Sequence, residues 1–148
     1  MKVVLVGMCN PRSSDRRLAL VPHPPNSAGH RLFLMLRKRV PCTHIEYRDG
    51  FERRNLVSTT IWSQQTARRN AECMVGELQG RTVLLLGAAV RDAFGLPPVL
   101  VKPVVQRGVT FRQLPHPSGR CRWYNNPRHR RVAEMLLEEL YMEGKTCV

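Results

Sequence analysis

The chain has 148 residues, enough for one domain with a single buried core and too few for a second domain. Its 24 Lys and Arg against 11 Asp and Glu give a formal net charge of +13, so we expect an anionic partner, first of all a polyphosphate backbone. A membrane surface is the competing anion, but no apolar run approaches the roughly 20 residues that span a bilayer.

We therefore expect a monomer with one domain over residues 1–148 and no membrane partner. The N-terminus has no apolar stretch of signal-peptide length, which favours a cytoplasmic protein, or a nuclear one in a eukaryote. Five cysteines are scattered without a C-x-x-C pair, at Cys9, Cys42, Cys73, Cys121 and Cys147. This set argues against a disulfide framework and a structural zinc site and favours reduced thiols, so we expect no metal and no cofactor.

The first half of the chain alternates apolar and helical patterns. Residues 2–8 form a continuous Val-rich run, typical of a parallel strand buried on both faces. A loop follows over 11–25, and apolar residues then recur at helical spacing between Gly29 and Val40. Residues 43–53 are polar and predict a loop or a short helix. Residues 54–59 predict a short strand.

The second half continues this alternation. Its expected helices lie at residues 64–78, 88–94 and 127–144. Its expected strands lie at 82–86 and 110–114, with an irregular or edge segment at 99–105 that Pro103 interrupts. Strands alternating with helices predict right-handed crossovers and a parallel sheet. The expected fold class is α/β, a three-layer α/β/α sandwich with a central four-stranded parallel sheet.

The loop after the last strand is the first candidate site. Pro115 and Pro117 bracket His116, and they hold the imidazole on a stiff, extended segment. Cations and aromatic rings follow closely, as a site on a nucleic acid requires, at Arg120, Arg122, Trp123 and Tyr124. The alternative is a Pro-rich connection with a solvated histidine.

Two further polar residues are expected near this loop. Ligands of parallel α/β sheets bind beyond the carboxyl ends of the strands. Asn10 follows the first expected strand, Asn55 opens the second, and His116 follows the last. The three side chains would converge on one crevice, provided that the second strand ends early.

Segments spread over nearly the whole chain resemble motifs of the uracil-DNA glycosylase superfamily, and they follow one another along the chain in the same order as in that family. Residues 116–120, His-Pro-Ser-Gly-Arg, are similar to its His-Pro-Ser motif, and residues 7–11 are similar to the Gly-x-Asn-Pro motif of the mismatch-specific and single-strand-selective branches, with one extra residue. Residues 26–33 resemble the segment that borders the base pocket, 54–57 the strand with the pyrimidine-reading Asn, and 84–87 the third strand and its exit. Some branches carry a four-Cys iron–sulfur cluster, whose spacing is absent here, so we expect none.

The resemblance implies a monofunctional DNA glycosylase that hydrolyses the N-glycosidic bond of uracil or a modified pyrimidine flipped out of DNA. His116 would donate to the base oxygen on which negative charge develops. Asn10 would hold the attacking water, and Asp15, the nearest carboxylate, is the lesser candidate for that role. No metal is required.

The resemblance also implies binding roles. Asn55 would meet the pairing edge of the base, and Phe33 or His30 would border it; Asn55 as a turn residue and Phe33 as a core residue are the alternatives. The DNA-binding candidates are Ser118 for a flanking phosphate, Arg120 as the wedge in the vacated space, Arg122 and Arg128 as cations, and Trp123 as a stacking surface. For Arg128 a solvated helix start is the alternative.

Two other functions stay open. One is a DNA-binding protein of the same fold that does not cleave. The other is an enzyme of the same fold that acts on an unusual modified base, since the extra residue before Asn10 and the glycine at Gly119 suggest a changed pocket.

Overall fold

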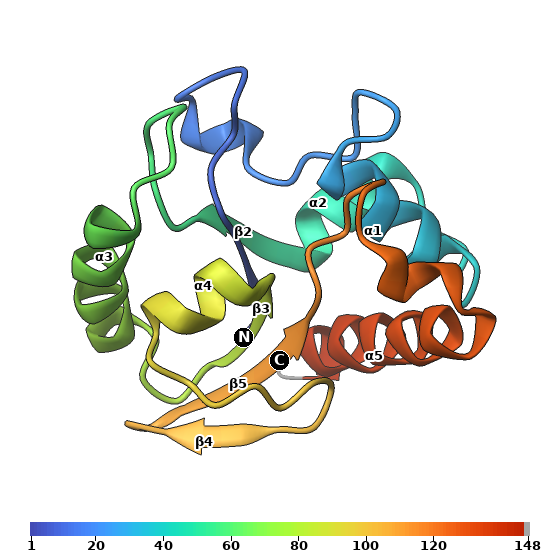
Figure 1. Ribbon diagram of the computed structural model, residues 1–148. Helices are drawn as coiled ribbons and strands as arrows, with labels where there is room; N and C mark the ends of the chain where they lie inside the picture. Colours follow the sequence, from blue (N-terminus) through green and yellow to red (C-terminus); the bar gives the residue numbers. More distant parts are fainter. Residues whose placement is uncertain (147–148) are drawn as a thin grey trace.

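The computed structural model describes residues 1–146; Cys147 lies outside the described residues. The chain forms one sheet of five strands in the order β2-β1-β3-β5-β4 (Figure 1). The strands are β1 (Val3–Gly7), β2 (Phe51–Asn55), β3 (Thr82–Leu86), β4 (Val104–Gln106) and β5 (Val109–Leu114). All neighbouring pairs are parallel except β4 with β5, which is antiparallel.

The expected α/β class is confirmed, and the expected count of four parallel strands is wrong. The segment after Pro103 forms β4, an edge strand that returns to β5 through a two-residue turn. Arg107 and Gly108 both have positive φ, at 51° and 76°, which is the type I′ geometry that matches the twist of an antiparallel pair. The edge position tolerates the proline that precedes the strand.

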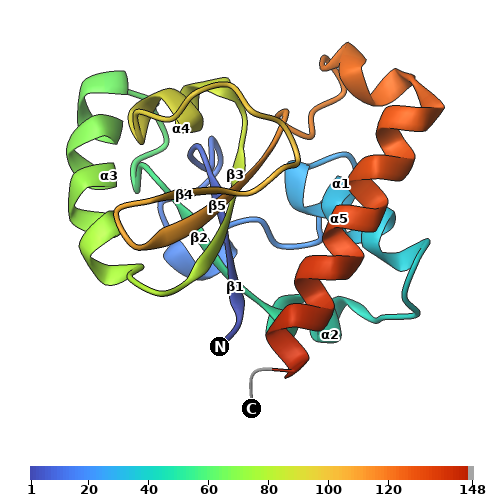
Figure 2. The same ribbon diagram turned by 90° about the horizontal axis from the view of Figure 1, so that it is seen from below.

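Within residues 1–146, five helices and two 3-10 turns cover the sheet. The helices are α1 (Ala28–Arg37), α2 (His44–Gly50), α3 (Gln64–Glu77), α4 (Ala88–Ala93) and α5 (Pro127–Thr146), and the 3-10 turns are η1 (Arg16–Leu18) and η2 (Arg122–Asn125). Helices α1, α2 and α5 lie on one face of the sheet, and α3 and α4 lie on the other (Figure 2). No helix in residues 1–146 combines the length and the apolar character needed to cross a membrane.

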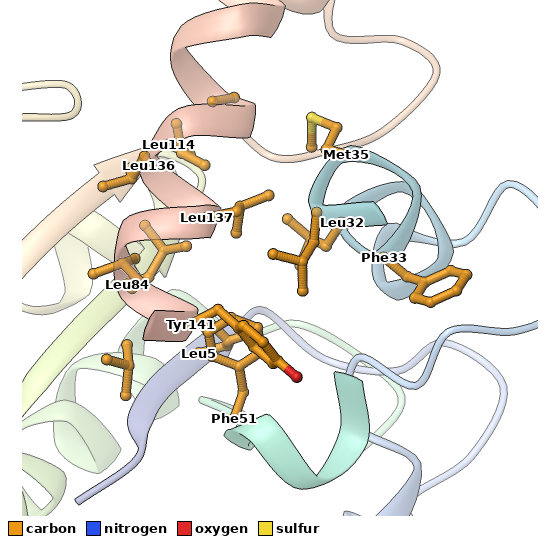
Figure 3. Packing of buried hydrophobic residues seen from close by; sticks show 14 of the residues in the cluster. Leu5, Leu32, Phe33, Met35, Phe51, Leu84, Leu114, Leu136, Leu137 and Tyr141 are labelled. Carbon is orange, nitrogen blue, oxygen red and sulfur yellow. The ribbon is translucent and has the colours of Figure 1, made fainter. Parts of the chain in front are cut away.

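Both faces of the central strands are buried, which explains their continuous apolar sequences. On one face Leu5 and Leu84 pack with Leu32 of α1 and Leu137 of α5 (Figure 3). On the other face Val4, Val6, Val83 and Leu85 pack with the small residues Ala67 and Ala71 of α3 and with α4. Because side chains alternate along each strand, each central strand contributes to two separate hydrophobic cores, one on each face of the sheet.

The second strand lies earlier than the sequence predicts. Helix α2 begins with a capping box between Thr43 and Glu46 and ends at Gly50, and β2 starts at once with the buried Phe51. The remaining residues of β2 are polar because it is the other edge of the sheet. Asn55 thus becomes the last residue of the strand and faces Gly7 in the β1 register.

Candidate functional site

A cavity of about 380 Å³ lies at the carboxyl ends of the parallel strands. Its walls are the segment after β1, the end of β2, the chain that leads into α1, and the loop after β5. Asn10, Asn55 and His116 all line it, together with Ser118. The structure thus brings together three polar residues that are more than 40 positions apart in the sequence.

Two glycines make this convergence possible. Asn55 and His116 belong to β2 and to the exit of β5, and between them stand β1 and β3. β1 ends in Gly7, where an added Cβ would lie 3.3 Å from the Asn55 Oδ1, and β3 runs into Gly87, where an added Cβ would lie 3.2 Å from the His116 Cβ. Because a glycine ends β1 and another directly follows β3, no Cβ at these two positions crowds Asn55 or His116.

His116 is half-buried, and burial lowers the pKa of its imidazole. Within the described residues neither ring nitrogen has a hydrogen-bond partner. The ring is therefore neutral at physiological pH, with one N–H and one lone pair available to a ligand.

The loop that carries His116 is tied down on both sides. The buried hydroxyl of Tyr124 donates to the Pro115 carbonyl oxygen at 2.6 Å, and the Gly87 N–H donates to the Leu114 oxygen at 2.9 Å. After the histidine, the Ser118 N–H donates to the His116 oxygen at 2.8 Å. These bonds, with the two prolines, position the imidazole before any ligand arrives.

The two asparagines differ in how they are held. The Asn10 Oδ1 accepts from the Arg12 N–H at 2.9 Å, a local turn that leaves its amide N–H groups free to donate. The Asn55 side chain has no hydrogen-bond partner in residues 1–146, so its donor and its acceptor are both available. The Val57 N–H donates to the Met8 oxygen at 3.0 Å, which extends the pairing of the two segments past the strands and holds the loop that contains the extra residue before Asn10.

The two base-bordering candidates on α1 lie outside the cavity wall. Phe33 is 2% exposed and packs edge-on against His44 and Tyr47, with ring centroids at 4.5 and 5.9 Å. Its ring points away from α5, whereas Leu32 points toward it (Figure 3). His30 is turned back to its own helix start, where its Nδ1 accepts from the Asn26 N–H at 3.1 Å. The core interpretation of Phe33 therefore fits, and a base-bordering role for either residue does not.

The wall on that side is formed by Leu20, Val21, Ala28 and Gly29. Ala28 and Gly29 belong to the segment 26–33 that was expected to border the base pocket, whereas the sequence analysis missed Leu20 and Val21. A Cβ added at Gly29 would lie 2.1 Å from the Val21 oxygen, which leaves no room for a side chain. Tyr47 fixes the same segment, since its hydroxyl donates to the Leu20 oxygen at 3.0 Å.

Asp15 lies away from the cavity of His116. It lines a neighbouring cavity of about 540 Å³, caps η1, and pairs with Arg17 at 2.9 Å. The hydrogen bonds from Arg17 lower the pKa of this carboxyl. No Asp or Glu is among the described residues that line the His116 cavity, so a water there would be held by uncharged polar groups such as Asn10.

The DNA-binding candidates surround the exit of the loop. Ser118 lines the His116 cavity and also a cavity of about 240 Å³ beside it. Arg120, Arg122 and Arg128 are exposed, and none of them makes an ion pair within the described chain. One face of Trp123 is already covered by His129, stacked at 4.7 Å, so at most the other face can receive a base.

Among residues 1–146, no group of three or more His, Cys, Asp or Glu is placed to hold a metal ion. No protein-family model matches the chain, and a search of curated proteins gave no match.

Proposed function

We propose that the protein is a monofunctional DNA glycosylase of the uracil-DNA glycosylase superfamily, which removes uracil or a modified pyrimidine from DNA and leaves an abasic site. The observation that carries the proposal is that Asn10, Asn55 and His116 line one cavity at the carboxyl ends of the parallel strands. Its volume of about 380 Å³ lies within the range of small-molecule pockets. The three-layer α/β/α description belongs to the same proposal, supported by the two cores on either side of the sheet.

His116 would supply the main electrostatic contribution. Breaking the glycosidic bond places positive charge on the sugar and negative charge on the departing base. A neutral imidazole on a tethered loop donates its N–H to the base oxygen without reorganising. One such preorganised donor lowers a barrier by about 3–4 kcal/mol.

The two asparagines would hold the attacking water and the edge of the base. Asn10 holds the attacking water through its free amide N–H groups, while its Oδ1 is fixed by Arg12. Asn55 offers a donor and an acceptor to the O4 and N3–H of a uracil edge. With no carboxylate in the wall, catalysis depends on stabilising the departing base rather than on deprotonating the water.

DNA binding would rest on the positive charge of this surface. The net charge is +13, and the exposed arginines beyond Ser118 are free to meet phosphates. Flipping a base costs a few kcal/mol, least where the base is mismatched or unpaired. Arg120, which follows Gly119, is placed to enter the vacated space.

The test is base excision on oligonucleotides that contain uracil, 5-hydroxymethyluracil or a mismatch, followed by alkali. We expect strand scission with the natural chain and its loss in His116→Ala and Asn10→Ala. Arg48→Gln is the charge control, because Arg48 lies on α2 near the amino end of β2, at the opposite end of that strand from the cavity. Scission that persists in His116→Ala would exclude this mechanism.

A non-catalytic DNA-binding protein of the same fold is the second candidate. The observation in its favour is the lack of a carboxylate among the described residues of the cavity wall, so that no Asp or Glu is placed there to deprotonate the water. In that case the same oligonucleotides would bind in a salt-sensitive way and none would be cut.

A further inference from the structure

The larger cavity next to the proposed base site has no role in the chemistry above. It measures about 540 Å³ and lies along the free edge of β2, between α3 and the loop that leads into η1. Asn55 and Ser13 line both cavities, so the two share a wall. A ligand in one cavity is therefore a near neighbour of a ligand in the other.

The charges in this cavity are only partly compensated. Its two acidic residues are already engaged: Glu77 pairs with Arg54 at 2.6 Å, and Asp15 pairs with Arg17 at 2.9 Å. Arg54 also pairs with Glu52 at 2.8 Å. Two other arginines of the wall, Arg16 and Arg53, make no ion pair within the described part of the chain. The cavity thus keeps two positive charges that form no ion pair within residues 1–146, although Asp49 lies near enough to Arg53 to favour its charged form.

Of these two arginines, Arg53 gives the stronger indication of a bound anion. Its Nη1 donates to the Ala19 oxygen at 2.7 Å, but its Nε is buried and has no hydrogen-bond partner. Burial of the guanidinium lowers its pKa and outweighs the opposite effect of Tyr47 and Asp49. A buried, unpaired donor on a charged group is costly unless a ligand satisfies it.

Hydroxyl groups complete the lining. Ser13, Ser14 and Ser58 line the cavity, and none of their O–H groups donates to another described residue. Guanidinium groups and hydroxyls are the side chains that proteins use to bind phosphate oxygens. The donor set contains no free carboxylate that would repel an anion.

We propose that this cavity is a phosphate-binding subsite, in which Arg16, Arg53 and the neighbouring serines hold a phosphate group beside the base cavity. The identification of the anion as phosphate rests on the proposed function, because a nucleotide whose base meets Asn55 carries its phosphates close by. The phosphate would come from a phosphodiester of the DNA strand or from a free phosphate compound.

The experiment follows the Arg53 Nε–H signal and the backbone amides of Ser13 and Ser14 by NMR. One arm adds inorganic phosphate and the other adds a short oligothymidine without uracil, both against sodium chloride at equal ionic strength. We expect a saturating shift of the Arg53 signal. Saturation by the oligonucleotide at concentrations where inorganic phosphate has no effect identifies a phosphodiester, and saturation by inorganic phosphate alone identifies a free phosphate. No shift in either arm, or the same shift in chloride, overturns the proposal.

Variants give a second readout. Arg16→Gln removes an exposed side chain with no internal bond, so it should fold, and it should lower the salt slope of oligonucleotide binding by about one. Arg53→Gln should weaken binding as well, although it also loses the bond to Ala19. Lys102→Gln carries the same charge change beside β4, at the other edge of the sheet, and should leave the NMR shifts unchanged. An unchanged slope in Arg16→Gln counts against the site.

Neither arm measures excision. A protein that binds phosphate here but cuts no oligonucleotide keeps the subsite and loses the glycosylase function, and an active glycosylase with no Arg53 shift shows the reverse.

Discussion

Gly87 and His116 are packed so closely that a methyl group on Gly87 would lie 3.2 Å from the His116 Cβ. Gly87 has φ 101° and ψ 156°, a backbone region that is essentially restricted to glycine. Its N–H also bonds to Leu114, two residues before the histidine. The exit of β3 thus sets the position of the imidazole.

Gly87→Ala should therefore impair both folding and excision. The backbone region alone costs about 1–3 kcal/mol in the free energy of unfolding. The displaced His116 should in addition lower the excision rate of the molecules that remain folded, since a shift of about 1 Å can cost roughly 100-fold. Urea denaturation and single-turnover excision at a temperature where the variant is folded measure the two effects.

Gly76→Ala is the matched control. Gly76 lies within α3, and an added Cβ would meet nothing within 4 Å. Alanine there should stabilise the helix by about 0.5–1 kcal/mol and leave excision unchanged. If both variants lost activity equally, the contact between Gly87 and His116 would not be the cause.

The pH dependence of stability should report on His116. Burial lowers its pKa in the folded state below the usual value of about 6.5 that holds in the unfolded chain. Below about pH 6.5 the unfolded chain therefore binds more protons, so this residue lowers stability as the pH falls toward its folded pKa, and its effect is constant above that window. Urea denaturation of the natural chain and of His116→Gln, from pH 8 to pH 4, isolates this difference.

An NMR titration of the His116 ring gives the pKa directly. A value at or above about 6.5 in the folded protein would contradict the burial argument, and a value above about 7 would leave most of the ring protonated at neutral pH.

The elements that sequence reasoning located well are those whose signal is local. β1 and β3 are buried on both faces, so they are apolar without interruption. The helix expected over residues 64–78 is confirmed as α3, and at its start the Ser63 side chain accepts from the Thr66 N–H. Asn126 likewise accepts from the Arg128 N–H at the start of α5, although that helix runs past Gly144 to Thr146.

The two edge strands were predicted less well, because their positions depend on pairing with other strands rather than on a local sequence pattern. After Phe51, β2 consists of charged and polar residues, and its position follows from pairing with β1 rather than from its own pattern. β4 has three residues and depends on the turn at Arg107 and Gly108, which lacks the Asn-Gly signal of such turns.

Some residues of the candidate site could likewise be predicted from the sequence, and others could not. Asn10 and His116 stand beside prolines and glycines that mark loops after strands, so their convergence could be predicted from topology. The part of the wall formed by Leu20 and Val21 could not be predicted, because nothing in the sequence marks these residues as neighbours of Gly29. A helical stripe does not tell which of its residues faces a core, and Phe33 was ambiguous for this reason.

Tyr124→Phe should loosen the loop without disturbing the cavity wall. The hydroxyl of Tyr124 is buried and bonded to the Pro115 oxygen, so its loss should lower the free energy of unfolding by about 1 kcal/mol. The excision rate should fall because His116 follows Pro115 directly. Tyr141→Phe is the control: its hydroxyl bonds to no other described residue, so stability should change by less than about 0.5 kcal/mol and the rate should hold. A Tyr124→Phe rate equal to that of the natural chain would mean that the prolines alone position the histidine.

Asn55→Asp should shift the base preference from uracil toward cytosine. The amide of Asn55 offers a donor to O4 and an acceptor to N3–H, whereas a carboxylate only accepts. A carboxylate would therefore oppose the O4 of uracil and accept from the N4 amino group of cytosine, a difference of about 1–3 kcal/mol per base contact. Single-turnover excision on matched uracil and cytosine oligonucleotides measures the ratio of the two rates.

Asn55→Ala separates recognition from a general loss of structure. It removes both contacts, so it should slow excision of uracil without creating activity on cytosine, and circular dichroism should show the same fold for both variants. Gly7 leaves room for either side chain, whereas a Cβ at that position would lie 3.3 Å from the Asn55 Oδ1. If Asn55→Asp kept the uracil rate of the natural chain, the pairing edge of the base would have to be read elsewhere in the cavity, and the roles proposed for Asn10 and His116 would need a different base orientation.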